Sequence, residues 1–208
     1  MENEKFTCVL LVARKHGLET IKKLISLSNY KINGIFTHRL NPKVYDSKRN
    51  QRQDYIEFEK ISTDNKIPFF TIDNSDEKFK LNEFVDNNEF DFLISVSWRY
   101  IISPKIFKKA KFGSINLHRG DLPKYAGIEP IRKAIENGEK EIVISCHHIS
   151  EEIDAGEIIF KKTHPSNINQ NLSLENNVER LKDEITQYFP ELTIKSLEFI
   201  IRERKNGK

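Results

Sequence analysis

The sequence predicts an α/β fold built on a mostly parallel sheet, and two patterns support this prediction. The first is a series of short runs rich in β-branched and aromatic residues. They are CVLLVA (8 to 13), INGIFT (32 to 37), PFFTI (68 to 72), DFLISVSW (91 to 98) and SINLH (114 to 118). Nearly continuous apolar runs of this length are typical of strands buried on both faces.

The second pattern lies between these runs, where the segments show the apolar spacing of amphipathic helices. They are LETIKKLISL (18 to 27), DYIEFEKIST (54 to 63) and KFKLNEFVDN (78 to 87). Strand and helix alternate along the chain, and this alternation favours parallel strands joined by crossover helices. The first 118 residues therefore predict a doubly covered parallel sheet.

The second half of the chain predicts further elements of the same domain. A helix from Ile131 to Asn137 ends at Gly138, and EIVISCHHIS and EIIFKKTHP follow as two strands that we expect to extend the sheet at one edge. The tail from about residue 174 has a helical pattern, which is interrupted at Pro190 and ends in the charged run RERKNGK. Without a repeat or a composition shift, we expect a single domain over residues 1–208.

Composition and charge narrow the partners and the compartment. The net charge is only +3, so the pI near 8.7 reflects a lysine-rich surface and implies no nucleic-acid partner. No apolar run approaches the roughly 18 residues that span a bilayer, and the acidic start MENEKF is unlike a secretory signal. We expect a cytoplasmic protein that does not bind membranes, in which Cys8 and Cys146 are buried, reduced thiols.

Three polar residues carry the chemistry that the sequence predicts. Asn116 and His118 are two residues apart at the end of a predicted strand, so both side chains leave the same face. Asp154 lies in the turn-like segment EIDAGE between two predicted strands, and it reaches the pair only if those strands fold back beside SINLH. An amide, an imidazole and a carboxylate together can polarise a carbonyl and move a proton, which suits acyl transfer.

The frame around these residues resembles the formyltransferase family that uses 10-formyltetrahydrofolate. That family contains glycinamide ribonucleotide transformylase, methionyl-tRNA formyltransferase and the sugar N-formyltransferases. Its pattern is N-x-H, L-P-x-Y-x-G, [ST]-x-[HM] and D-x-G-x-[IV], in this order. The matching pieces here are Asn116 to His118, Leu122 to Gly127, Ser145 to His147 and Asp154 to Ile158. The resemblance implies a Rossmann-like, mostly parallel sheet with helices on both faces, and it extends from the first strand to about residue 165.

The resemblance also implies a role for each catalytic residue. Asn116 would donate a hydrogen bond to the formyl oxygen, and His118 would take a proton from the attacking amine or pass one to the departing folate nitrogen. Asp154 would orient the imidazole and favour its protonated form. Taken singly, Asn116 could instead cap a turn, His118 could be a buried histidine with its hydrogen bonds satisfied, and Asp154 could be an ordinary turn aspartate.

The co-substrate 10-formyltetrahydrofolate is expected beside the fourth strand, where SWRYIISP matches the family's apolar pterin-pocket segment. The residues expected to contact it are Trp98, Tyr100, Ile101 and Ile102, together with Ile149 and Ile153 of the following turn. Trp98 and Tyr100 could also be plain core aromatics. The adjacent residues Cys146, His147 and His148 do not have the spacing of metal ligands, so no metal is expected. We expect His147 to contact the catalytic side chains and not the substrate.

The amine acceptor is the open part of the prediction. The residues expected to bind it are Arg14, Lys15, Arg39, Arg119 and Tyr125, although the basic ones could be ordinary solvated side chains. The turn ARKHGLET lacks the glycine-rich phosphate cradle of the glycinamide ribonucleotide enzymes, and Arg119-Gly120 replaces the pair usual after the histidine. A small-molecule amine, most simply a nucleotide-linked amino sugar, is therefore expected, with glycinamide ribonucleotide as the alternative and a non-catalytic nucleotide-binding domain as a remote one.

Further expectations concern the chain as a whole. Its length leaves no room for the tRNA-binding barrel of methionyl-tRNA formyltransferases or for the regulatory domain of formyltetrahydrofolate hydrolases. A homodimer is compatible with the sequence, which does not decide it. The polar segment from Arg39 to Asp54 follows a strand, and a loop of this length is often functional or mobile.

Overall fold

The computed structural model describes residues 5–207, which form two compact units. The first unit ends at Gly113 and the second begins at Ser114. Each unit has its own paired strands and its own helices. The expectation of one domain over residues 1–208 stays a prediction.

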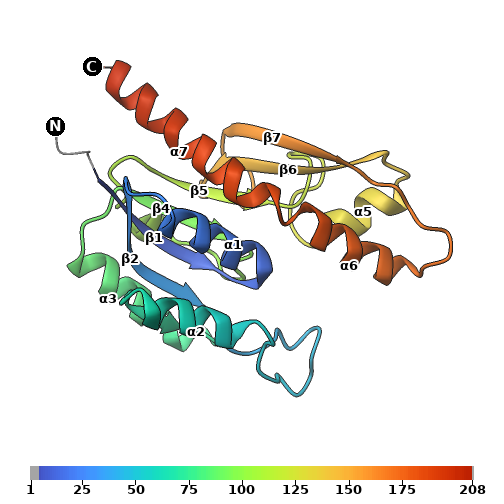
Figure 1. The fold of residues 1–208 in the computed structure, drawn as a ribbon, viewed down its shortest axis with the longest axis horizontal. Coiled ribbons are helices and arrows are strands. Elements are labelled where there is room, and N and C mark those ends of the chain that lie inside the picture. Colours follow the sequence, from blue (N-terminus) through green and yellow to red (C-terminus); the bar gives the residue numbers. More distant parts are fainter. Residues whose placement is uncertain (1–4, 208) are drawn as a thin grey trace. The chain divides into compact units, whose positions relative to one another are not determined.

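The strands of the first unit run parallel in the order β3-β2-β1-β4 (Figure 1). They are β1 (Phe6–Val12), β2 (Tyr30–Thr37), β3 (Phe69–Thr71) and β4 (Phe92–Val96). The chain moves outward from β1 to β3 and then returns to place β4 on the other side of β1. Ligands of open α/β sheets bind at such a reversal, beyond the carboxyl ends of the two strands.

Helices connect these strands and cover both faces of the first unit's sheet. They are α1 (Arg14–Ile25), α2 (Tyr55–Asp64), the 3₁₀ turn η1 (Asp76–Lys78), α3 (Phe79–Asn87) and the short α4 (Pro104–Phe107). Tyr55 of α2 packs on Phe69, whereas Phe84 of α3 packs on Phe70. Adjacent strand residues point to opposite faces, so α2 and α3 lie on opposite sides of the sheet. The predicted covering of both faces is confirmed in this unit.

The central strands of the first unit form its core. Leu10 and Leu11 of β1, like Leu93 and Ile94 of β4, are fully buried although adjacent side chains point to opposite faces. This confirms that the continuous apolar runs are strands covered on both sides. Helix α1 packs closely on the end of β1 from its first turn, because a Cβ added at Gly17 would lie only 2.9 Å from the Cβ of Val12.

The strands of the second unit are antiparallel neighbours in the order β5-β6-β7. They are β5 (Gly113–His118), β6 (Glu141–His148) and β7 (Ile158–Pro165). The two strands expected from EIVISCHHIS and EIIFKKTHP are confirmed, and they form a hairpin. The turn of this hairpin, residues 149–157, lies beyond the carboxyl end of β6.

Helices α5 (Pro130–Glu136), α6 (Leu174–Ile185) and α7 (Tyr188–Asn206) complete the second unit. Figure 1 shows α7 running along the hairpin, and it packs on both β6 and β7. The helical tail is interrupted at residues 186–187 and not at Pro190 itself. Pro190 lies in the first turn of α7, where a backbone N–H has no partner within the helix and its absence costs little.

Both cysteines are free and buried, as the sequence predicts. Burial raises the pKa of the Cys146 thiol to about 12, and the Ser196 hydroxyl opposes the rise. Cys8 lies in β1, where burial and then the charge of Asp91 raise its pKa further. Among residues 5–207, no helix combines the length and the apolar character needed to cross a membrane.

Candidate active site

Strand β5 presents Asn116 and His118 on one face. Ile115 and Leu117 alternate with them and point into the core, where they are 0% and 3% exposed. Alternation along a strand therefore holds the two polar side chains side by side, as the sequence predicts. His118 is itself buried at 9% exposure.

The hairpin of β6 and β7 brings Asp154 to this pair. β6 runs antiparallel to β5 with Asn116 opposite His147 and His118 opposite Ser145, and the turn after β6 starts at Ile149, whose N–H donates to the Ser114 carbonyl near the amino-terminal end of β5. Asp154 has a φ of 54°, a left-handed conformation that aspartate tolerates better than most residues. Its Oδ2 accepts a hydrogen bond from the Gly127 N–H at 2.9 Å. The expectation that the two strands fold back beside SINLH is confirmed.

Both ring nitrogens of His118 face acceptors. Nδ1 lies 3.3 Å from Oδ2 of Asp154, and Nε2 lies 2.7 Å from the carbonyl oxygen of Tyr125. A carbonyl oxygen can only accept, so Nε2 carries the hydrogen and Nδ1 is the basic nitrogen of the neutral ring. A proton added at Nδ1 would be stabilised at once by the carboxylate of Asp154.

Burial lowers the pKa of His118 below its usual range, although Asp154 and the Tyr125 carbonyl act in the opposite direction. The neutral imidazole is therefore the resting form near pH 7. Burial alone would raise the pKa of Asp154, but the neighbouring histidines, His147 and His118, and the Gly127 N–H hold it below its usual range. The site thus pairs an ionised carboxylate with a neutral base.

Asn116 lies between Asp154 and His147. Its Nδ2 atom is 3.1 Å from Nε2 of His147 and 3.4 Å from Oδ1 of Asp154. Asp154 therefore contacts both Asn116 and His118, one with each carboxylate oxygen. An amide donor, a base and a carboxylate converge, and this arrangement can polarise a carbonyl oxygen while a proton is taken from a nucleophile.

The loop after His118 is held against the site by Ser145 and Gly120. The Ser145 hydroxyl donates to the Gly120 carbonyl at 2.7 Å and accepts from the Leu122 N–H at 3.2 Å. A Cβ on Gly120 would lie 2.8 Å from both His118 Nε2 and the Tyr125 carbonyl. Gly120, which the sequence singled out as unusual, thus leaves space for the hydrogen bond that fixes the His118 ring.

Some contributions to the site come from backbone groups to which the sequence assigned no role. They are the Tyr125 carbonyl and the Gly127 N–H, both within the L-P-x-Y-x-G turn. The signal was present in Gly127, whose φ of 80° favours glycine. A turn that needs a glycine directly beside a catalytic strand is a candidate for backbone contacts to that strand.

The residues expected to contact folate occur in both units. In the first unit, Trp98 stacks on His38 with ring centroids 4.2 Å apart, and Tyr100 meets both rings edge-on. Ile101 is exposed and Ile102 is half-buried. These residues follow β4 at the reversal of strand order, where a ligand is expected.

In the second unit, Ile149 and Ile153 bracket the turn before Asp154. The Ile149 N–H donates to the Ser114 carbonyl at 2.8 Å, which continues the strand pairing beyond β6. Ile153 is 64% exposed, and Ile128, next to the Asp154-bound Gly127, is 78% exposed. Apolar side chains left in solvent beside a catalytic group offer a surface to a flat ligand. Folate contact at Ile149 and Ile153 stays a prediction.

The residues expected to bind the acceptor lie in different settings. Arg14 and Lys15 are exposed at the start of α1, and exposed Arg39 lies 3.8 Å from Oδ2 of Asp73. Arg119 is half-buried, and its charge acts on His118. The Tyr125 hydroxyl is turned away to donate to Glu139 at 2.6 Å, so its backbone carbonyl is the group that reaches the site. Acceptor binding by these residues stays a prediction.

The segment from Arg39 to Asp54 is fastened to the first unit by arginines. Buried Arg52 donates to the His38 carbonyl at 2.7 Å and to Asp54 at 2.8 Å. Arg99 donates to the Leu40 carbonyl at 2.6 Å. Although polar and irregular, this loop is therefore anchored at both ends.

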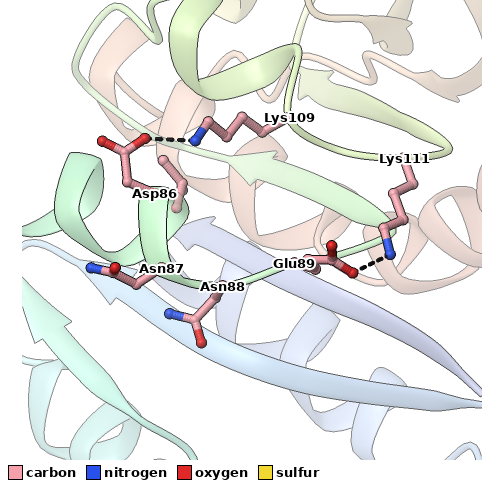
Figure 2. A pocket seen from close by; sticks show the side chains of 7 residues that line it. Asp86, Asn87, Asn88, Glu89, Lys109 and Lys111 are labelled. Carbon is pink, nitrogen blue, oxygen red and sulfur yellow. Dashed lines mark hydrogen bonds and ion pairs between the residues drawn. The ribbon is translucent and has the colours of Figure 1, made fainter.

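The first unit also has a surface depression that is lined by charged side chains. Figure 2 shows the charged groups that line it: Lys109 donates to Asp86 at 2.6 Å, and Lys111 donates to Glu89 at 2.5 Å. Each of these lysines is thus paired with a carboxylate, and Asp86 also accepts from Lys105 at 2.9 Å. Within the described residues, no group of three or more His, Cys, Asp or Glu side chains could hold a metal ion.

The sequence model of the family described as formyl transferase matches residues 7–193. The chain belongs to the formyl transferase family. This membership confirms the resemblance read from the N-x-H, L-P-x-Y-x-G and D-x-G-x-[IV] pieces. Asn116, His118 and Asp154 all lie within the residues that this family model matches.

Curated relatives of the chain include methionyl-tRNA formyltransferases. The protein from Orientia tsutsugamushi is 27% identical over 92% of this chain, and the one from Fusobacterium nucleatum is 29% identical over 73%. The bifunctional polymyxin resistance protein ArnA from Wigglesworthia glossinidia brevipalpis is 31% identical over 69% of this chain. The chain spans only 59%, 47% and 20% of the lengths of these three proteins.

Solved structures share the fold of this chain. The phosphoribosylglycinamide formyltransferase from Anaplasma phagocytophilum matches with a TM-score of 0.69 and 19% identity, over 94% of this chain and 88% of that one. A formyltetrahydrofolate deformylase from Pseudomonas syringae pv. tomato matches with a TM-score of 0.67 and 19% identity, over 94% of this chain and 61% of that one. The predicted Rossmann-like formyltransferase fold is confirmed.

Proposed function

We propose that this formyl transferase moves the formyl group of 10-formyltetrahydrofolate to a primary amine. The observation that carries the proposal is the placement of His118, whose Nδ1 faces the Asp154 carboxylate at 3.3 Å while Nε2 is hydrogen-bonded to the Tyr125 carbonyl at 2.7 Å. A base held next to an ionised carboxylate suits the deprotonation of an attacking amine.

The proposed reaction forms one C–N bond and breaks another. The amine nitrogen bonds to the formyl carbon, the bond from that carbon to the folate nitrogen breaks, and one proton passes from the amine to the folate nitrogen. His118 Nδ1 takes this proton and later gives it up, while Asp154 stabilises the imidazolium in between. Asn116 donates from its amide to the formyl oxygen, as an oxyanion-hole donor does.

The formyl group itself is supplied by 10-formyltetrahydrofolate when it is bound. The donor set fits such a co-substrate, because an amide donor and a base lie within one cluster and exposed apolar Ile153 and Ile128 lie beside it. Trp98, Tyr100, Ile101 and Ile102 are the further side chains that we propose for the pterin. The buried, free thiols of Cys8 and Cys146 suit a reducing compartment, so we propose the cytoplasm as its location.

For the acceptor we propose a nucleotide-linked amino sugar. Arg14, the first residue of α1, follows β1 after a single residue, so the turn between them is short. The space beside Gly17 is occupied by the Val12 side chain, so this turn offers no glycine cradle for a phosphate. Exposed Arg14, Lys15 and Arg39 would meet the nucleotide phosphates instead. Glycinamide ribonucleotide is the second candidate, because structures of phosphoribosylglycinamide formyltransferases share the fold.

One assay tests the donor and the acceptor together. The purified protein is mixed with 10-formyltetrahydrofolate and one amine at a time, and release of tetrahydrofolate is followed by absorbance. The panel contains nucleotide-linked 3-amino and 4-amino sugars, glycinamide ribonucleotide and methionyl-tRNA. Turnover with an amino sugar supports the full proposal. Preferential turnover of the ribonucleotide or the tRNA overturns the acceptor, and absence of both turnover and folate binding overturns the enzyme.

A further inference from the structure

The ring of His147 is fixed in one tautomer by its surroundings. It is 2% exposed, and its Nδ1 lies 2.8 Å from the His148 carbonyl oxygen. Because a carbonyl oxygen only accepts, Nδ1 must carry the hydrogen, and in the neutral ring Nε2 then holds a lone pair. That lone pair faces the Asn116 amide at 3.1 Å.

The Asn116 amide faces two acceptors with its nitrogen. Its Nδ2 lies 3.1 Å from His147 Nε2 and 3.4 Å from Asp154 Oδ1, and those two acceptors are 3.5 Å apart. The three atoms form a nearly equilateral triangle, so the angle at Nδ2 is about 65°, whereas the two N–H bonds of a planar amide diverge by about 120°. One N–H directed between the two acceptors would lie about 33° from each of them, and the second N–H would then point away from both.

The same two acceptors disfavour the alternative orientation of the Asn116 amide, in which its oxygen and nitrogen exchange places. With the Asn116 oxygen in place of Nδ2, three acceptors would face one another without a proton between them: the amide oxygen, the His147 lone pair and the Asp154 carboxylate. Buried acceptors left without a donor are costly.

We propose that His147 is a positioning residue that sets the orientation of Asn116. By capturing one N–H together with Asp154, it turns the other N–H outward, where the formyl oxygen would accept it. The inference rests on the proposed function only in naming that oxygen. The orientation itself is a property of the protein without any ligand. Asp154 alone could hold the amide nitrogen, but only through its longer 3.4 Å contact.

The first test reads the amide directly, without activity. In protein labelled with ¹⁵N-asparagine, the two side-chain protons of Asn116 are assigned by their loss in Asn116→Ala. We expect one proton shifted strongly by its bridging hydrogen bond. His147→Leu should collapse the difference between the two protons, and His147→Gln, whose amide oxygen can accept in place of Nε2, should restore most of it. An unchanged Asn116 signal in His147→Leu would overturn the proposal.

The second test is kinetic and uses a double-mutant cycle. His147→Leu should lower kcat by about 10-fold with little change in the KM for folate, because an oxyanion-hole donor acts mainly in the transition state. His147→Gln should recover to within about 3-fold of wild type. In the Asn116→Ala background, His147→Leu should have no further effect, because its route of action is already removed. A loss of equal size in both backgrounds would mean a general structural role.

His164→Gln is the matched control. His164 is a partly buried histidine of β7 that contacts Tyr188 and Glu184, and the substitution makes the same chemical change away from Asn116. It should leave both the amide signal and turnover unchanged. If wild-type protein turns over no amine, the proposed function fails, but the amide experiment still decides whether His147 orients Asn116. Where His147→Leu does not fold, the comparison of His147→Gln with wild type decides: an Asn116 signal that keeps its wild-type splitting supports the proposal, and a collapsed one overturns it.

Discussion

The Nδ1 atom of His118 lies 3.3 Å from Oδ2 of Asp154, while the Nε2 atom of the same ring is held by the Tyr125 carbonyl at 2.7 Å. This relationship sets the direction of proton transfer, because only Nδ1 can accept a proton and only Asp154 is placed to stabilise it. The tautomer is imposed by a backbone carbonyl of the L-P-x-Y-x-G turn. That turn therefore fixes the ring of His118.

The first prediction concerns the two side chains that act on the formyl group. His118→Ala should lower kcat by about 10²-fold or more, since the base is lost. Asn116→Ala should lower it by about 10²- to 10³-fold, since the donor to the developing oxyanion is lost. Steady-state kinetics with the best amine of the panel measures both. Wild-type turnover in either variant would refute the role given to that residue.

The second prediction concerns pH. With the neutral ring of His118 as the proposed base, kcat/KM should fall as the pH drops through its pKa, which burial places below the usual value near 6.5. Asp154→Asn removes the negative charge that raises this pKa, so the acid limb should move to still lower pH while the rate falls. An acid limb above pH 7 in the wild type, or a shift to higher pH in Asp154→Asn, would contradict this assignment.

The sequence predicted the strands, the crossover helices and the closeness of Asn116, His118 and Asp154, because these depend on local pattern and on the order of the motif pieces. Alternation placed Asn116 and His118 on one face, and the apolar runs marked strands buried on both sides. The short helix from Pro104 to Phe107 was not predicted, because four residues carry too little periodicity. The interruption of the tail was placed at Pro190, although a proline fits the first turn of a helix and the break comes just before it.

The contacts behind the trio could not be predicted, because they depend on register and on backbone atoms. His147 faces Asn116 only because β6 pairs with β5 in one particular register. The Tyr125 carbonyl and the Gly127 N–H carry no side-chain signal at all. For Tyr125, the sequence indicated the ring as the functional group, whereas the ring hydroxyl bonds to Glu139 and the carbonyl bonds to His118.

The third prediction tests the space beside His118. Gly120→Ala places a Cβ 2.8 Å from His118 Nε2, 2.8 Å from the Tyr125 carbonyl and 2.7 Å from the Cβ of Pro130. The ring and the carbonyl must separate, so we expect a loss of about 1–3 kcal/mol of stability and a fall in kcat larger than any change in KM. Gly207→Ala, at the end of α7, is the control and should change neither. Full activity in Gly120→Ala would show that the hydrogen bond to Tyr125 is dispensable.

The fourth prediction concerns acid stability and His38 in the first unit. Burial lowers the pKa of His38 to about 2, and the charges of Arg99, Arg52 and Arg14 add to this, while its bond to the Ile72 carbonyl opposes it. As the pH falls below about 6.5, His38 becomes protonated in the unfolded chain but stays neutral in the folded protein. The free energy of unfolding therefore decreases from about pH 6.5 down to about pH 2.

For His38 this loss amounts to roughly 2 to 3 kcal/mol between pH 6.5 and 4.5. His38→Gln should therefore be less stable than wild type at pH 7 but show a flatter decline over this range. Urea unfolding at pH 7.0, 5.5 and 4.5 gives the free energy of unfolding of each protein and so the slope of its decline with pH. Parallel slopes in the two proteins would mean that His38 does not titrate differently on unfolding.

The fifth prediction concerns Gly156, which lies directly behind the site. A Cβ at this position would stand 1.7 Å from the His148 carbonyl oxygen, the group that holds His147 Nδ1. Gly156→Ala must push this carbonyl away, so His147 loses its anchor and Asn116 loses its fixed partner. We expect a destabilised protein whose remaining folded fraction, measured at 10 °C, has a kcat at least about 10-fold below wild type. Ala155→Gly, one residue earlier and exposed, is the control for altered turn flexibility. A Gly156→Ala protein that is less stable but retains full kcat would show that this turn does not affect catalysis. The close approach of Gly156 to His148 would then be a requirement of packing alone.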